Sequence, residues 1–157
     1  MKYKFIMVTL VIAVVLGFGF IIFNKESNIG NSILADVQGQ EVVVYKSPTC
    51  GCCSVYATYL KKKGFKVMIE DVTDMSSVKR GNGIPPELSS CHTSLVGGYV
   101  VEGHIPVEAI QKLLSEKPAI KGIAMPGMPV GSPGMPGTKE FPFEIWKLGE
   151  EGLFMTI

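Results

Sequence analysis

The chain has 157 residues, 46% of them hydrophobic, and its 15 Lys and Arg against 14 Asp and Glu give a formal net charge of +1. That length is enough for one domain with its own core plus extensions. The balanced charge excludes the strongly basic surface that binds nucleic acid or anionic lipid, so we expect no nucleic-acid partner.

The first 25 residues are expected to be a membrane segment. Residues 1–4 are basic, and residues 5–23 form an uncharged run of 19 residues, close to the roughly 20 residues that span a bilayer as a helix. A signal-peptide core is shorter, about 7–15 residues, so an uncleaved transmembrane helix is favoured over a signal removed after Ala35. In both cases Lys2 and Lys4 stay in the cytoplasm. We therefore expect the remainder of the chain in the periplasm or at the cell exterior.

Residues 26–39 are polar, with scattered Asn, Ser and Gly, which is typical of a spacer. A domain is then expected over residues 40–157. It begins with a buried strand at residues 40–46, which are rich in β-branched and aromatic side chains. Residues 54–63 carry apolar side chains at helical spacing, and three lysines followed by Gly64 predict the end of this helix.

Three cysteines, Cys50, Cys52 and Cys53, lie where this strand turns into this helix. At a helix N-terminus, unpaired N–H groups and the macrodipole favour the thiolate over the thiol. Cys50 and Cys53 have the C-x-x-C spacing of thioredoxin-like redox motifs. Cys52 would misdirect disulfides in a dithiol exchange site but adds a ligand to a metal site. A disulfide that serves only as a staple is disfavoured, because so short a loop removes little unfolded-state entropy.

The elements that follow predict a thioredoxin-like α/β fold. A strand is expected at residues 65–70, a short helix at 75–80 with Asp74 as its N-cap, and a hairpin with strands at 93–96 and 99–102. A helix follows at residues 107–114. The order β-α-β-α-β-β-α is that of the thioredoxin-like topology.

Cys91 and His92 occupy the loop that enters the third strand of this order. In thioredoxin-like folds that loop lies against the C-x-x-C turn and usually carries a cis-proline, whose place His92 takes here. We therefore expect Cys91 beside the other three sulfurs. The alternative for Cys91 is a buried small hydrophobic residue.

The C-terminal part contains a Pro/Gly/Met loop and a hairpin. Residues 125–137 are punctuated by Pro and Gly and hold Met125, Met128 and Met135. Each methionine alone could be core filler, but three thioethers on a rigid loop suit Cu(I). Residues 143–148 and 153–157 predict a closing hairpin, with Trp146 and Phe154 packed on the domain.

The candidate ligands are four thiolates with imidazoles and thioethers nearby, a soft set too large for one tetrahedral ion. This surplus suggests several ions bridged by sulfur, and copper is the favoured metal outside the cytoplasm. Zinc is disfavoured because a second ligand pair is missing, and an iron–sulfur cluster because the domain is exported. The set comprises Cys50, Cys52, Cys53, Cys91, His92, His104, Met125, Met128 and Met135.

Four ordered motifs resemble the CopG family of small exported bacterial proteins associated with copper resistance. They are residues 45–53 (YKSPTCGCC), 83–93 (GIPPELSSCHT), 97–106 (GGYVVEGHIP) and 125–135 (MPGMPVGSPGM). The resemblance implies a thioredoxin-like domain that binds a cluster of copper ions through Cys50, Cys52, Cys53 and Cys91. The membrane run is not part of the family pattern and suggests a tethered version.

We therefore expect an exported, membrane-anchored protein that binds Cu(I) in copper resistance or homeostasis, with copper redox activity as a further expectation. The alternative is a thiol–disulfide oxidoreductase in which Cys50 attacks and Cys53 resolves. The residues leave open whether the chain is an enzyme, either a copper or a thiol oxidoreductase. Expected partners are copper ions, the membrane through the N-terminal helix, and other exported copper-handling proteins.

Overall fold

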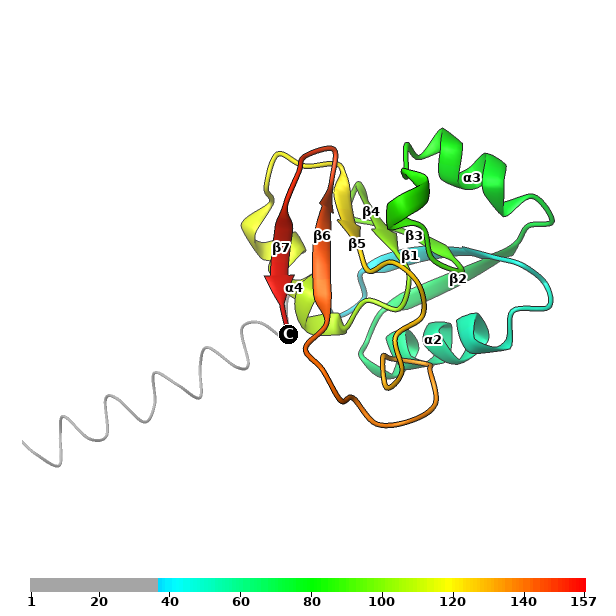
Figure 1. Ribbon diagram of the computed structural model, residues 1–157. Helices are drawn as coiled ribbons and strands as arrows, with labels where there is room; N and C mark the ends of the chain where they lie inside the picture. Colours follow the sequence, from blue (N-terminus) through cyan, green and yellow to red (C-terminus); the bar gives the residue numbers. More distant parts are fainter. Residues whose placement is uncertain (1–36) are drawn as a thin grey trace, which may run out of the picture. The chain divides into compact units, whose positions relative to one another are not determined.

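The computed structural model describes residues 37–157, which form a mixed α/β unit with a seven-stranded sheet and three helices (Figure 1). The expected membrane segment and nearly all of the expected spacer lie outside these residues. Within 37–157, no helix is both long enough and apolar enough to cross a membrane. The strands are β1 (Glu41–Lys46), β2 (Lys66–Asp71), β3 (Thr93–Val96), β4 (Tyr99–Glu102), β5 (Gly122–Ala124), β6 (Glu144–Leu148) and β7 (Leu153–Thr156). The helices are α2 (Gly51–Lys62), α3 (Met75–Gly81) and α4 (Val107–Glu116), with a 3₁₀ turn, η1, at Pro86–Leu88.

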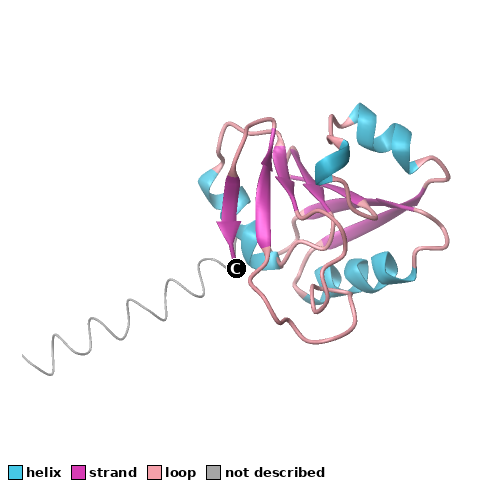
Figure 2. Cartoon of the chain, viewed as in Figure 1, coloured by secondary structure: helices cyan, strands magenta, loops and turns pink. Residues whose placement is uncertain are grey.

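The strands lie in the order β2-β1-β3-β4-β5-β6-β7. The β1–β2 and β4–β5 pairs are parallel, and the other four pairs are antiparallel. The predicted sequence of elements from the first strand to the third helix is confirmed by β1, α2, β2, α3, β3, β4 and α4. Figure 2 shows α2 and α3 on opposite sides of the β1–β2 part of the sheet.

Apolar side chains cover both faces of the sheet, as the period of two in a strand requires. One face packs against the apolar sides of α2 and α4, where Tyr56, Leu60 and Ile110 are buried. The smaller cluster on the other face includes Ile84, Val100 and Leu148. The sheet therefore has an apolar core on each of its two faces. This packing holds the first turn of α2 and the loop before β3 in place.

Two features of the fold differ from the predictions. Helix α2 begins at Gly51 rather than at residue 54, so that Cys50 is its N-cap and Cys52 and Cys53 lie in its first turn. No side chain caps this end, and the sequence therefore carries no start signal there. Strand β5 was also not predicted, because three residues are too few to show a periodicity.

The remaining predicted elements are confirmed within one or two residues at each end. Asp74 is the N-cap of α3 and accepts a hydrogen bond from the Ser77 backbone N–H at 3.1 Å. The closing hairpin is formed by β6 and β7, where Phe154 packs on the main core and Trp146 is half-buried. The loop before β3 contains no cis peptide bond, in line with His92 in the place of a proline.

Candidate metal centre

The cysteine triplet starts helix α2. Cys50 and Cys53 are joined by a disulfide with Cα atoms 5.4 Å apart, and the Cys52 sulfur lies 3.6 Å from that of Cys50. Cys53 is buried, whereas Cys50 and Cys52 are half-buried. The first turn of α2 contains no acidic residue, so that nothing in it offsets the positive end of the helix dipole. Reduction of the disulfide would present three sulfurs at one helix end.

The fourth sulfur comes from the loop before β3. The Sγ atoms of Cys91 and Cys53 are 3.5 Å apart, and the four Sγ atoms of the chain all lie within 4.8 Å of one another. The expected convergence of two distant segments is therefore present. Burial, followed by the neighbouring Cys52, raises the pKa of the Cys91 thiol to about 11. A thiol of this kind ionises when a cation replaces its proton.

His104 presents a defined nitrogen to this group. Its Nδ1 lies 2.6 Å from the Pro133 carbonyl oxygen, which can only accept, so Nδ1 carries the proton. Its Nε2 is then unprotonated in the neutral ring and lies 3.0 Å from the Cys91 sulfur. Burial lowers the pKa of His104, which keeps the ring neutral at neutral pH. A backbone carbonyl on one ring nitrogen and an unprotonated nitrogen on the other is the usual arrangement of a metal-binding histidine.

His92 completes the nitrogen side of the site. Its Nδ1 is 3.3 Å from the Cys91 sulfur, and its fully buried Nε2 has no hydrogen-bond partner among residues 37–157. Burial, followed by the charges of His104 and Lys79, lowers the pKa of His92 to about 3. The ligand atoms of Cys91, His92 and His104 all lie within 4.8 Å of one another, so that these residues form a second group that could hold a metal ion. The unpaired nitrogen is a buried polar atom that an ion or a water would satisfy.

Tyr56 supports both histidines from beneath. Its ring centroid lies 4.6 Å from that of His92 and 5.4 Å from that of His104. Its hydroxyl donates to the Ile105 carbonyl at 2.9 Å and is fully buried. The sequence indicated Tyr56 only as part of the apolar face of a helix. Its position shows that this face also forms the floor of the candidate site.

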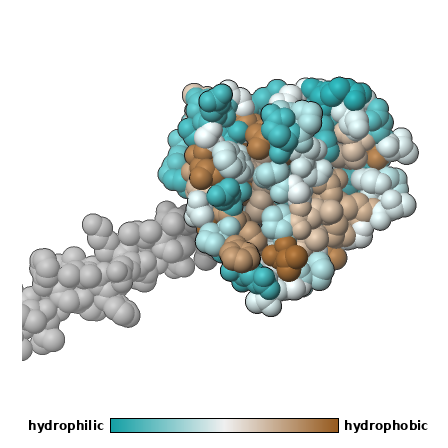
Figure 3. Space-filling model, viewed as in Figure 1, coloured by the Kyte–Doolittle hydropathy of each residue, from teal (hydrophilic) through white to brown (hydrophobic). Residues whose placement is uncertain are grey.

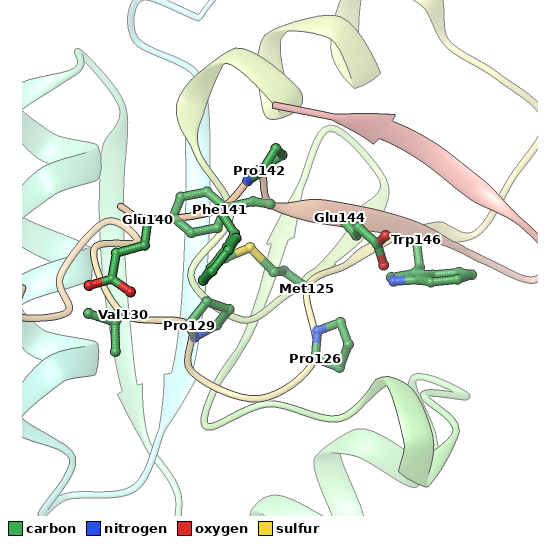
Figure 4. A pocket seen from close by; sticks show the side chains of 10 residues that line it. Met125, Pro126, Pro129, Val130, Glu140, Phe141, Pro142, Glu144 and Trp146 are labelled. Carbon is green, nitrogen blue, oxygen red and sulfur yellow. The ribbon is translucent and has the colours of Figure 1, made fainter. Parts of the chain in front are cut away.

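The three methionines lie in different surroundings. Met125 is buried and lines an apolar cavity of about 490 Å³ whose walls include Pro129, Phe141 and Trp146 (Figure 4). Met128 is 51% exposed, and Met135 is half-buried. Figure 3 shows apolar surface over part of the loop between β5 and β6. Met125 therefore occupies the position of a core side chain, the alternative that its sequence context left open.

The loop of residues 125–137 contacts both segments that supply the sulfurs, the start of α2 and the loop before β3. Gly127 pairs with Ser90 in a parallel bridge, and its N–H donates to the Ser89 carbonyl at 3.1 Å. At the other end of the loop, a Cβ atom on Gly134 would lie 3.0 Å from the Cys52 carbonyl oxygen. This loop therefore packs on the start of α2, and its Pro133 carbonyl sets the tautomer of His104. Sequence reasoning did not find the role of Pro133, because only the path of the loop reveals it.

Comparison with known proteins gives a consistent result. The family described as "Protein of unknown function, DUF411" matches residues 88–135. Two solved structures, both of a copper resistance protein copG (forms 2 and 1), are each 37% identical and each cover 76% of this chain. The first has a TM-score of 0.70 with 99% of its own chain covered, and the second 0.69 with 98%. Comparison with the curated proteins gave no match.

Proposed function

This chain belongs to the CopG family of copper resistance proteins, and on that premise we propose that it is an exported protein that binds Cu(I) in copper resistance. The observation that carries the proposal is the convergence of four sulfurs within 4.8 Å from two distant segments. Thiolates are soft ligands that select Cu(I). The order β-α-β-α-β-β-α and the strand order β2-β1-β3-β4 support a thioredoxin-like architecture for the domain.

The proposed ligands divide into a sulfur side and a nitrogen side that share Cys91. Cys50, Cys52, Cys53 and Cys91 bind Cu(I) as thiolates, and sulfur bridges allow more than one ion. The Nε2 of His104, with its Nδ1 proton held by Pro133, is an outer ligand, as is His92. The half-buried Met135 and the exposed Met128 are proposed to contact copper during its entrance or exit.

The disulfide supports a redox step at the same sulfurs. Cys50 and Cys53 as a dithiol can give one electron to each of two Cu(II) ions. The products are two Cu(I) ions, the Cys50–Cys53 disulfide and two protons released to solvent. Cys52, Cys91 and His104 would still be available to hold Cu(I). An exported reductant of disulfides would return the dithiol.

The second candidate function is thiol–disulfide exchange, which the observed disulfide favours. Cys50 is half-buried and would attack, whereas the buried Cys53 would resolve the mixed disulfide. In this function Cys52 and Cys91 have no required role. The two candidates therefore differ in what they demand of Cys52.

Anaerobic titration of the reduced, full-length protein with Cu(I) separates the two functions. Copper binding predicts saturation above one equivalent and a lower stoichiometry in Cys52→Ser. Exchange predicts that Cys52→Ser keeps disulfide reductase activity and Cys50→Ser loses it. Met128→Ile tests whether Met128 contacts copper. Met68→Ile is its control, because Met68 is similarly exposed at 55% on strand β2. Binding of no Cu(I) by the reduced protein would contradict the copper proposal.

We also propose that the N-terminal segment tethers the domain to the membrane, outside the cytoplasm. The support is the uncharged run at residues 5–23 behind a basic start. N-terminal sequencing of the mature protein from the membrane fraction tests this proposal. A mature chain that begins near residue 36 and is found only in the soluble fraction would show a cleaved signal instead.

Recovery of exported proteins on the immobilised chain, with and without Cu(I), tests for copper-delivery partners.

A further inference from the structure

A buried carboxylate lies directly behind the loop that carries Cys91. Glu102 is the last residue of β4, and its side chain is fully buried. Its Oε1 accepts a hydrogen bond from the Ser90 backbone N–H at 2.7 Å, and its Oε2 accepts one from the Thr93 hydroxyl at 2.7 Å. Ser90 and Thr93 are the residues on either side of Cys91 and His92. One carboxylate therefore bonds to both ends of the segment that supplies the fourth sulfur.

The charge of Glu102 is compensated by Lys79 of α3. The ammonium group of Lys79 donates to Oε1, and the Lys79 side chain is only 14% exposed. A buried carboxylate is strongly unfavourable unless it is paired and hydrogen-bonded. Here the two oxygens receive three donors, one from α3 and two from the segment that carries Cys91. These contacts explain how the Glu102 carboxylate can be buried. Glu102 is not one of the proposed metal ligands, so its role at the site has still to be explained.

The residues next to Glu102 also hold the Cys91 loop. The Gly103 N–H donates to the His92 carbonyl at 3.0 Å, and His104 places its Nε2 beside the Cys91 sulfur. Proline would fix one backbone angle in this loop, whereas His92 leaves that angle free. Some other constraint must then hold the loop in register with the helix. The two hydrogen bonds of Glu102 contribute to this constraint together with the backbone contacts of Gly103 and Gly127, because they bind the loop on both sides of His92.

We propose that Glu102 is a positioning residue for the metal centre: its carboxylate holds Ser90 and Thr93 so that the Cys91 sulfur meets the Cys50–Cys53 turn. The metal arm of this proposal rests on the proposed function; the positioning of Cys91 does not. Lys79 has the separate task of neutralising the carboxylate. Contacts to Ser90 and Thr93 should therefore govern the site, while the ion pair should govern stability.

Three variants of the full-length protein separate the two tasks. Glu102→Gln keeps both loop contacts, because the amide oxygen can accept from Ser90 while the amide nitrogen donates to the Thr93 hydroxyl, but it loses the ion pair. Lys79→Met also removes the ion pair and leaves both loop contacts. Glu102→Ala removes the loop contacts and the ion pair together. Glu116→Gln is the control, since Glu116 is in an exposed ion pair with Lys112 on α4.

The first readout is Cu(I) affinity by anaerobic competition. Loss of outer-shell partners typically weakens metal binding by about 10–100-fold, and we expect a loss in this range for Glu102→Ala. Glu102→Gln and Lys79→Met should unfold at lower denaturant concentration yet keep the wild-type Cu(I) affinity. Equal losses of affinity in Lys79→Met and Glu102→Ala would overturn the proposal, since the ion pair would then account for the whole effect.

The second readout needs no metal and tests positioning even if Cu(I) binding fails. With Cys50, Cys52 and Cys53 all changed to Ser, the rate of Cys91 alkylation by iodoacetamide reports the exposure of this loop. We expect a faster rate in Glu102→Ala and an unchanged rate in Glu102→Gln. Thr93→Val removes one of the two loop contacts at nearly constant volume and serves if Glu102→Ala does not fold. An unchanged alkylation rate in both Glu102→Ala and Thr93→Val would refute the positioning role. If Glu102→Ala does not fold, an unchanged rate in Thr93→Val alone would refute it.

Discussion

The substitution Gly134→Ala tests whether the loop of residues 125–137 is pressed onto the start of α2. Gly134 has a φ of +87°, and an added Cβ would lie 2.9 Å from the Tyr56 nitrogen and 3.0 Å from the Cys52 carbonyl oxygen. Both are backbone atoms of α2. They cannot move aside without disturbing the helix, so the loop itself must lift.

The expected cost has two parts. A side chain in the left-handed region costs about 1–2 kcal/mol, and forcing an extra carbon into a packed contact costs about 1–3 kcal/mol, so Gly134→Ala should lose about 2–5 kcal/mol of unfolding free energy. Gly127→Ala is the matched control in the same loop, because Gly127 has a φ of +69° and no heavy atom within 4 Å of its added Cβ. Its loss should stay at about 1–2 kcal/mol, the backbone part alone.

Urea unfolding of both variants in the reduced, metal-free state measures this difference. Lifting the loop also withdraws the Pro133 carbonyl from His104 Nδ1, so Gly134→Ala should weaken Cu(I) binding while Gly127→Ala leaves it unchanged. Equal losses of stability in the two variants would refute the reasoning, since they would show that the close approach at Gly134 does not exist in solution.

Three further outcomes are expected. Cys91→Ser should lower the number of Cu(I) ions bound per chain, measured by metal analysis after anaerobic loading; an unchanged number would place Cys91 outside the centre. Tyr56→Phe leaves the Ile105 carbonyl unpaired and should cost about 1–3 kcal/mol in urea unfolding, without changing Cu(I) stoichiometry. The pKa of His92 falls from 6.5 to about 3 on folding, so the unfolded chain takes up this proton first. Stability of the metal-free protein should therefore be full above pH 6.5 and decline by up to about 1.4 kcal/mol per pH unit from 6.5 towards 3. His92→Gln should reduce this slope, and a slope that is identical in the variant would contradict the assignment.

Local signals predicted most of the elements. The hairpin strands were predicted at their observed limits, because Gly97 and Gly98 adopt the positive φ values that a two-residue turn requires. The start of α2 was placed three residues late, because cysteines provide no capping signal. Strand β5 forms because it pairs with β4 and β6. This is a tertiary effect, and three residues carry no sequence pattern that would predict it.

The candidate site was predicted unevenly, for physical reasons. The approach of Cys91 to the triplet could be expected, because the order of elements places its loop against the turn. The pairing of His104 with Pro133 could not, since the two residues are 29 positions apart and meet through an irregular loop. Glu102 did carry a signal: it is an acidic residue at the end of a strand whose other positions are apolar, and such a residue needs buried partners. Met125 lies in the core, and the sequence left its role open because a thioether that binds metal and one that fills a core look alike in sequence.

The separation of Cys53 and Cys91 by 38 positions has a consequence for the order of events when the chain is made. Cys50 and Cys53 are neighbours on one helical turn and can pair as soon as that turn has emerged. The fourth sulfur arrives only after β2, α3 and the loop before β3 have been synthesised and docked. A partly folded chain in which the loop before β3 has not docked can therefore close its disulfide but cannot assemble the complete set of sulfurs, so a full metal load would report that folding has reached at least this loop.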